Sequence, residues 1–144
     1  MTRDDLIAEL RSLGWSEEAF EIGLRARFQC EYCDRDLLAS LDDYDAWQVD
    51  HIVPASREGA SHISNYALSC KTCNFLKRHS LPVESIDPVA DRKHAIAVIR
   101  AFVQVRRDVK NERVRKIREL IHGAAAAIGL EVTPNTSPEC ARER

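Results

Sequence analysis

Residues 49–77 read VDHIVPASREGASHISNYALSCKTCNFLK, and this stretch decides the fold. Apolar and polar residues partly alternate over 46–52, and a short apolar run covers 66–69, so we expect a strand in each place. The segment between them begins with a proline and contains Gly59, as loops do. A short helix is expected from Thr72 to about His79. The stretch therefore predicts a β-hairpin followed by a helix.

Four of the five cysteines stand in two Cys-x-x-Cys pairs. Cys30 and Cys33 form the first pair, and Cys70 and Cys73 form the second, with 36 residues between the pairs. Doubled pairs of this kind are typical of a tetrahedral site for structural Zn²⁺. The alternatives are two disulfides, four reduced thiols, or an iron centre with the same ligands. Cys140 lies in a polar tail and is expected to be a bystander.

Helical patterns flank this stretch on both sides. Residues 2–13 carry a capping box and an apolar stripe, and a serine-capped helix is expected over 17–28. Asp87 and Pro88 together predict the start of a third helix, with aspartate as its N-cap and proline at the first helical position. Apolar residues then recur at helical spacing for about 30 residues, up to Gly123.

The chain is long enough for one small domain, and its charge is unevenly distributed. Of 144 residues, 44% are hydrophobic and 31% are charged, which excludes a wholly disordered or collagen-like chain. No run approaches the roughly 20 apolar residues of a membrane span, and no signal peptide is visible, so we expect a cytoplasmic protein with no membrane partner. Residues 92–118 carry 10 basic and 2 acidic side chains, although the net charge is −2. This stretch favours a polyanionic partner, while a solvated helix face is the alternative.

The segment around the second cysteine pair carries the groups that phosphodiester hydrolysis needs. An aspartate and a histidine are adjacent at a strand end, where a bend would let both side chains face one place. Carboxylate and amide oxygens suit Mg²⁺ or Mn²⁺, a neutral imidazole takes a proton from water, and cations hold phosphates. We expect these groups to meet where the hairpin joins the helix: Asp50, His51, Asn65, Asn74, Lys77 and Arg78.

In order and spacing, these residues resemble the HNH endonuclease family of the ββα-metal superfamily, in its zinc-stapled form. The matching pattern is Asp-His-Ile-x-Pro, then a glycine and an asparagine, then Cys-x-x-Cys-Asn-x-x-Lys, and with the first cysteine pair it covers 30–77. The chain departs from the family at two positions. Ala60 follows Gly59 where relatives often have a second glycine, and Asn74 stands where many have histidine.

The resemblance implies a role for each matched residue. His51 is the general base that activates water, and Asp50 and Asn74 are the ligands of one catalytic Mg²⁺ or Mn²⁺. Asn65 fixes the catalytic loop and the orientation of His51. The remaining assignments are Lys77 and Arg78 as substrate-binding residues, and Cys30, Cys33, Cys70 and Cys73 as ligands of one structural Zn²⁺.

The sequence as a whole predicts an α+β fold around a small ββα-metal unit. Its parts are an N-terminal helical segment (1–29), a zinc-stapled nuclease core (30–80), a basic C-terminal helical segment (81–130) and a disordered tail (131–144). The expected function is metal-dependent hydrolysis of phosphodiester bonds in DNA, with double-stranded DNA as the partner. The alternative is a non-catalytic, zinc-stabilised module that binds nucleic acid or a partner protein. A single such site cuts one strand, so a double-strand break would need a homodimer or two successive nicks. A role as an effector within a larger complex is also compatible with the sequence.

Overall fold

A computed structural model describes residues 1–131, and its contacts divide the chain into two compact units. The first unit is Met1–Arg107, and the second begins at Asp108. The tail expected to be disordered lies outside the described residues from position 132 onward, and so does Cys140. Within residues 1–131, no helix combines the length and apolar character needed to cross a membrane.

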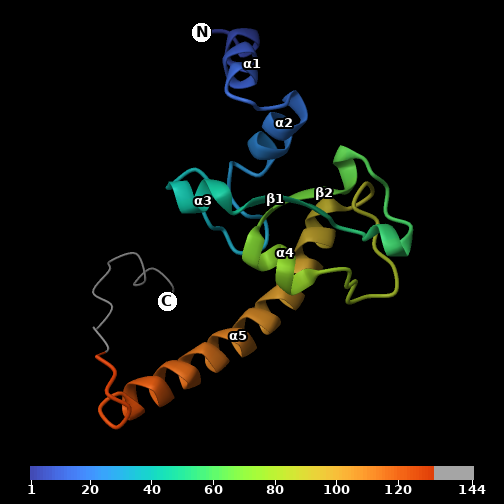
Figure 1. The fold of residues 1–144 in the computed structure, drawn as a ribbon. Coiled ribbons are helices and arrows are strands. Elements are labelled where there is room, and N and C mark those ends of the chain that lie inside the picture. Colours follow the sequence, from blue (N-terminus) through green and yellow to red (C-terminus); the bar gives the residue numbers. More distant parts are fainter. Residues whose placement is uncertain (132–144) are drawn as a thin grey trace. The chain divides into compact units, whose positions relative to one another are not determined.

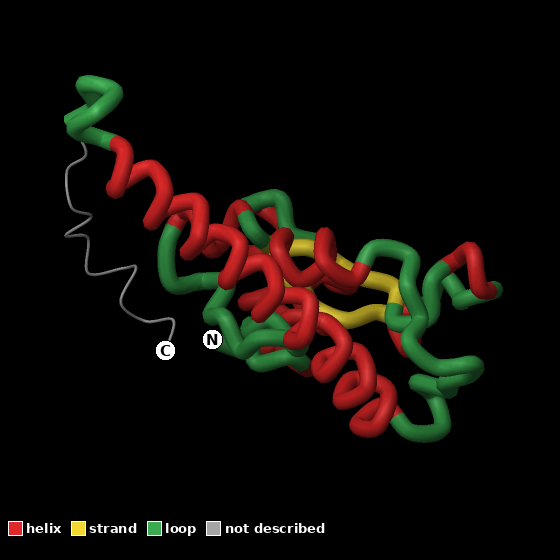
Figure 2. The backbone as a smooth tube through the Cα atoms, turned by 90° about the horizontal axis from the view of Figure 1, so that it is seen from below, coloured by secondary structure: helices red, strands yellow, loops and turns green. Residues whose placement is uncertain are grey.

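The first unit combines helices with one two-stranded sheet, which confirms the predicted α+β class. Figure 1 labels the elements, and Figure 2 shows the two strands side by side. In chain order the elements are α1 (Arg3–Ser12), α2 (Glu17–Arg25), α3 (Leu41–Asp45), β1 (Trp47–His51), β2 (Tyr66–Cys70), α4 (Lys71–Lys77) and α5 (Arg92–Ala124), with short 3₁₀ turns at Ala55–Arg57 and Ile63–Asn65.

The predicted hairpin and helix form the centre of the first unit. β1 and β2 pair antiparallel in a regular register, from Trp47 opposite Cys70 to His51 opposite Tyr66. α4 begins directly after β2, and the Cys70 Sγ accepts a hydrogen bond from the Cys73 backbone N–H at 3.4 Å. Cys70 therefore ends the second strand and caps the helix that follows it.

The N-terminal helices have the predicted caps, but α2 is shorter than expected. The capping box at Thr2 and the serine cap of α2 are both present. α2 ends at Arg25 rather than near Phe28, because Arg27 and Phe28 adopt left-handed φ angles of 54° and 57° that a helix cannot continue. The short helix α3 was not predicted, since five residues are too few to show a helical period.

The long basic helix begins later than predicted. The Asp87 carboxylate caps only a single turn, in which it accepts hydrogen bonds from the backbone N–H groups two and three residues further on. The cap of α5 is Asp91, whose carboxylate accepts a hydrogen bond from the His94 backbone N–H at 3.0 Å. The Asp-Pro signal was therefore correct as a turn and wrong as the start of the helix, which spans Arg92–Ala124.

One hydrophobic core joins the hairpin to the first half of α5. Ala95, Ile99 and Val103 recur at every fourth position of α5 and are completely buried. They belong to one buried cluster with residues of the strands and the cysteine pairs, including Tyr32, Leu37, Ile52, Ala67, Leu68, Cys30, Cys70 and Cys73. Because three members of this cluster are thiols, the core depends on the state of the cysteines.

Candidate functional site

The four paired cysteines form one compact cluster. Their Sγ atoms all lie within 4.8 Å of one another, and the Sγ atoms of Cys33 and Cys70 are 3.8 Å apart. Sulfurs at about 2.3 Å from a tetrahedral zinc ion lie about 3.8 Å from one another, whereas disulfide sulfurs are about 2.05 Å apart. All four thiols are free, so the cluster fits one structural Zn²⁺ and contains no disulfide. Among the described residues it is the only group of three or more Cys, His, Asp or Glu side chains placed to hold a metal.

Hydrogen bonds within the cluster favour the thiolate form of two of its members. The bond from Cys30 lowers the pKa of Cys33 to about 7. Bonds from the other three thiols, with Cys30 first, lower the pKa of Cys70, while the pKa values of Cys30 and Cys73 are raised by hydrogen bonds within the cluster. Zinc binds the thiolate and not the thiol, so a bound ion would displace the remaining protons.

Arg107 of α5 lies against this cluster. Its Nη2 is 3.5 Å from the Cys73 Sγ and 3.9 Å from the Cys70 Sγ. Four thiolates around one Zn²⁺ leave two net negative charges, and a neighbouring guanidinium compensates part of that charge. The sequence analysis had considered only a polyanionic partner or a solvated face for the basic stretch of α5, because no local pattern shows that one of its arginines faces the thiols.

Replacement of Arg107 is expected to weaken the retention of zinc. In Arg107→Gln the thiolates lose their cationic neighbour, so Zn²⁺ should pass to a competing chelator about 10-fold faster. A chromogenic chelator follows the release directly. Arg113→Gln is the matched control, because Arg113 is an exposed arginine further along α5. Equal release rates from the two variants would show that Arg107 does not support the site.

Asp50 is buried and accepts hydrogen bonds from two side chains. The Tyr32 hydroxyl donates to Oδ2 at 2.7 Å, and the Lys77 Nζ lies 3.0 Å from Oδ2 and 3.2 Å from Oδ1. Burial raises the pKa of Asp50, while the charge of Lys77 and the bond from Tyr32 oppose that rise. Tyr32 lies between Cys30 and Cys33, so the cysteine cluster fixes the hydroxyl that holds Asp50. The sequence analysis missed Tyr32, because its pattern does not distinguish it from a core aromatic residue.

Lys77 lies in the interior of the first unit. Its side chain is 0% exposed, and its Nζ also donates a hydrogen bond of 2.7 Å to the His51 backbone carbonyl. The ammonium therefore faces oxygens of β1 and no solvent. The assignment of Lys77 as a substrate-binding residue stays a prediction, and in this structure the side chain holds α4 against the end of β1.

The His51 imidazole lies at the end of β1 and is half-buried. Its ring packs edge-on against Tyr66, its partner across the hairpin, with ring centroids 4.9 Å apart. Its Nε2 lies 3.4 Å from the Ser61 Oγ in the loop. His51 is the last residue of β1 and borders the loop, whereas Asp50 contacts Lys77 of α4. The charge of His51 also acts to lower the pKa of Asp50. The bend expected at this strand end stays a prediction.

Asn65 is buried and holds the loop between the strands. Its Oδ1 accepts a hydrogen bond from the Val53 backbone N–H, and its Nδ2 donates to the carbonyls of Val53 and Ala60, each at 2.9 Å. Its own backbone carbonyl accepts a hydrogen bond from the Ile52 N–H at 2.8 Å. Asn65 thus fixes the backbone that follows His51, and within the described residues no hydrogen bond links it to the His51 ring.

Gly59→Ala is expected to disrupt this loop. A Cβ at Gly59 would collide with the backbone carbonyl of Val53 and lie 2.9 Å from the carbonyl oxygen of Pro54. Backbone held by Asn65 cannot move aside, so we expect a loss of about 1–3 kcal/mol in the free energy of unfolding, measured in urea. Gly123→Ala is the control, since a Cβ there meets nothing within 4 Å. Equal stability of both variants would contradict a tightly held loop.

Asn74 and Arg78 differ in their relation to the site. Asn74 is half-buried one turn before Lys77 on the same face of α4, and its side chain makes no hydrogen bond among the described residues. Arg78 leaves this face, because α4 ends at Lys77 and Arg78 has a φ of 51°. Its guanidinium lies 4.5 Å from the ring centroid of Phe75, which is 56% exposed. Asn74 therefore lies on the face of α4 that carries Lys77, whereas Arg78 belongs to an exposed cation–aromatic pair.

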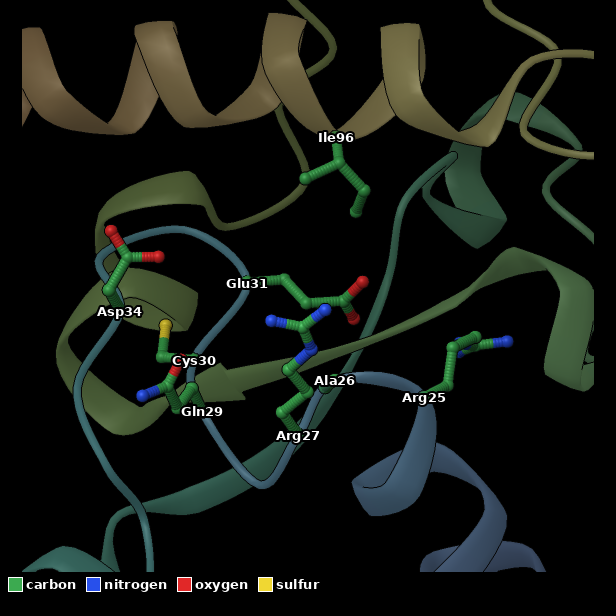
Figure 3. A pocket seen from close by; sticks show the side chains of 8 residues that line it. All are labelled: Arg25, Ala26, Arg27, Gln29, Cys30, Glu31, Asp34 and Ile96. Atoms are coloured by element: carbon green, nitrogen blue, oxygen red, sulfur yellow. The ribbon is translucent and has the colours of Figure 1, made fainter.

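A separate hollow of about 230 Å³ lies beside the first cysteine pair (Figure 3). In Figure 3, Arg25 and Arg27 reach it from the end of α2 and the following loop, and Ile96 reaches it from α5. Glu31 and Asp34 supply charge of the opposite sign. None of the predicted catalytic residues lines this hollow, so the candidate site is the junction of β1, α4 and the loop after β1.

Residues 30–80 match the protein-family model described as HNH endonuclease. The matched segment contains the cysteine cluster, both strands and α4, so it includes every residue of the candidate site. This match confirms the family resemblance read from the sequence. No curated protein and no solved structure matches the chain.

Proposed function

We propose that this chain is a metal-dependent endonuclease that hydrolyses phosphodiester bonds of double-stranded DNA, because residues 30–80 match the HNH endonuclease family model. One observation carries the proposal. Asp50 and His51 end the strand β1, Asn74 lies on the helix α4 that packs on that strand, and the cysteine cluster fixes both elements. A base, oxygen ligands and a rigid frame are the requirements of phosphate diester hydrolysis.

In this proposal His51 acts as the general base. A neutral imidazole takes a proton from water at neutral pH. Contact with Tyr66 restricts the rotation of the ring, while the distance of 3.4 Å from Nε2 to Ser61 leaves that nitrogen only weakly engaged. Ser61 is itself exposed, so water and substrate can reach this side of the imidazole.

Asp50 and Asn74 are the residues that would hold one Mg²⁺ or Mn²⁺. Both offer side-chain oxygens, which these hard cations prefer, and the amide of Asn74 has no other hydrogen bond among the described residues. A carboxylate accepts at about four lone-pair sites, and in Asp50 Tyr32 and Lys77 already occupy part of that capacity. When bound, the cation would neutralise the phosphate and stabilise the leaving oxygen.

Exposed basic groups in each unit support nucleic acid as the partner. Near the site, Arg78 and Phe75 present a cation and an aromatic face, which suit a phosphate and a base respectively. In the second unit, Arg115 forms ion pairs with glutamates of its own helix. Lys116 pairs with Glu112. Three further basic side chains of this unit form no ion pair among the described residues and are proposed to contact the DNA backbone: Lys110, Arg113 and Arg118.

A non-catalytic binding module is the second candidate, and two observations favour it. The Asp50 carboxylate is already paired with the ammonium of Lys77. The second unit also exposes apolar side chains that offer a surface to a partner protein or a second copy of the chain. These side chains are Val109, Val114, Ile117, Leu120 and Ile121. A module of this kind would bind without cleavage.

Labelled substrates separate the two candidates. Zinc-loaded protein would be incubated with Mg²⁺ and a DNA duplex, a DNA single strand or an RNA duplex of one sequence, each labelled at one 5′ end. The proposal predicts internal cleavage of the DNA duplex that stops when Mg²⁺ is omitted. Binding without cleavage of any substrate would support the non-catalytic module, and cleavage confined to RNA would contradict the assignment of DNA.

A further inference from the structure

The environment of Lys77 is unusual for a residue of a hydrolytic site. Its side chain is completely buried, and its Nζ lies within 3.2 Å of three oxygens, two from the Asp50 carboxylate and one from the His51 backbone. A buried ammonium is stable only where a carboxylate compensates its charge. Lys77 and Asp50 therefore neutralise each other, and each is the main reason why the other can be buried.

We propose that Lys77 gates the catalytic metal site, because its ammonium and the divalent cation compete for the Asp50 carboxylate. The inference rests on the proposed function, in which Asp50 and Asn74 hold the cation. It adds that metal binding and the buried position of Lys77 exclude each other. The Lys77 ammonium leaves Asp50 when the cation binds.

The distances explain the competition. The Lys77 Nζ lies 3.0 Å from one carboxylate oxygen and 3.2 Å from the other, so it covers both oxygens of Asp50. A cation on either oxygen would stand a few ångströms from the ammonium, and like charges at that distance in a buried site repel strongly. Tyr32 is a neutral donor to Oδ2 and imposes no such repulsion. The hydroxyl can therefore keep Asp50 in place while the cation replaces the ammonium.

The local fold gives Lys77 a means of leaving. Lys77 is the last residue of α4, and Arg78 breaks the helix with a φ of 51°. The four-carbon stem of a lysine has several rotatable bonds, and Arg78, which follows it, is exposed. The carbonyl of His51 would lose only one hydrogen bond. A displaced ammonium would emerge beside the exposed pair of Arg78 and Phe75, where the proposed DNA backbone supplies phosphates.

Metal affinity tests the gate without any measurement of cleavage. Mn²⁺ would be titrated into zinc-loaded protein in the absence of DNA, under mildly alkaline conditions, and the free Mn²⁺ followed by electron paramagnetic resonance. Lys77→Gln should bind Mn²⁺ at least about 10-fold more tightly than the wild type, because the competing charge is gone. Lys71→Gln is the matched control, since Lys71 is an exposed lysine at the other end of α4, and it should bind like the wild type.

A second measurement uses the wild type, so it does not depend on the folding of a variant. A buried lysine ammonium exchanges its protons slowly and gives a resolved nitrogen–proton signal in nuclear magnetic resonance. We expect one such signal, from Lys77, to disappear as Mg²⁺ saturates the protein. A signal that persists at saturation, or Mn²⁺ binding that is equal or weaker in folded, zinc-loaded Lys77→Gln, would overturn the gate.

Failure of the proposed gate can be distinguished from failure of the proposed function. If the chain cleaves DNA with Mg²⁺ while the Lys77 signal persists, the gate is wrong and the proposed function stands. If neither the wild type nor Lys77→Gln binds Mn²⁺ or cleaves DNA, the assignment of the metal to Asp50 and Asn74 fails, and the gate fails with it.

Discussion

His51→Ala is expected to reduce DNA cleavage by about 100- to 10,000-fold while the protein stays folded. The imidazole supplies the base of the proposed reaction, and Asp50, which faces α4 and is buried, cannot replace it. The ring makes few contacts, an edge-on packing against Tyr66 and one long contact with Ser61, so its removal costs little stability. The rate would be measured in single turnover on a labelled duplex with saturating Mg²⁺.

His62→Ala is the matched control for this experiment. His62 is a second histidine close to Ser61, and its Nδ1 accepts a hydrogen bond from the Ser64 backbone N–H at 3.2 Å. Among the described residues its side chain hydrogen-bonds only to Ser64, where it caps a short turn, so its variant should retain activity within a few-fold of the wild type. A His51→Ala variant that cleaves as fast as His62→Ala would rule out His51 as the base.

Cys70→Ser is expected to unfold the domain under conditions in which the wild type is stable. Cys70 contributes a thiol to the cluster, ends β2 and caps α4, so its sulfur joins the sheet, the helix and the metal site. The binding free energy of a structural zinc ion is about 10 kcal/mol or more, comparable to the total stability of about 5–15 kcal/mol of a typical domain. A serine hydroxyl does not replace a thiolate as a zinc ligand.

Zinc content and thermal unfolding, measured on the same samples, check this second prediction. The wild type should carry one Zn²⁺ per chain and unfold cooperatively, and removal of the zinc with a strong chelator should have the same effect as Cys70→Ser. The control is Cys140→Ser, at the fifth cysteine, which belongs to neither Cys-x-x-Cys pair; this variant should keep both the zinc and the midpoint of unfolding. A zinc-free Cys70→Ser protein that unfolds at the wild-type temperature would show that the core does not depend on the metal.

The elements of the domain could be predicted because short-range patterns specify them. The apolar runs over 46–52 and 66–69, the loop with Gly59 and the paired cysteines all lie close together in the sequence, and each has a local physical meaning. The late start of α5 was not predictable in the same way. Asp87 and Asp91 are both good N-caps, and only the packing of Ala95 and Ile99 on the core decides which of them begins the long helix.

The internal partners of the site could not be predicted, because they come from residues distant in sequence. Tyr32 lies 18 positions before Asp50, and Lys77 lies 27 positions after it. A lysine three positions after Asn74 has the same pattern whether it faces a phosphate or a buried carboxylate. Arg107 likewise belongs to a basic stretch, and its approach to the Cys73 thiol depends on how α5 packs. Long-range charge pairing therefore decides the features on which the sequence analysis was silent.

Conversion of supercoiled plasmid DNA by the purified, zinc-loaded chain tests the central claim most directly. Wild type and His51→Ala would be compared side by side with Mg²⁺, with Mn²⁺ and with no added divalent cation. A closed circular plasmid has no free ends, so any change of its form reports an internal cut. A metal-dependent endonuclease predicts nicked or linear plasmid for the wild type with either cation, and intact supercoiled plasmid for His51→Ala and for the samples without metal. Intact plasmid in every wild-type sample, or equal conversion by His51→Ala, would contradict the account.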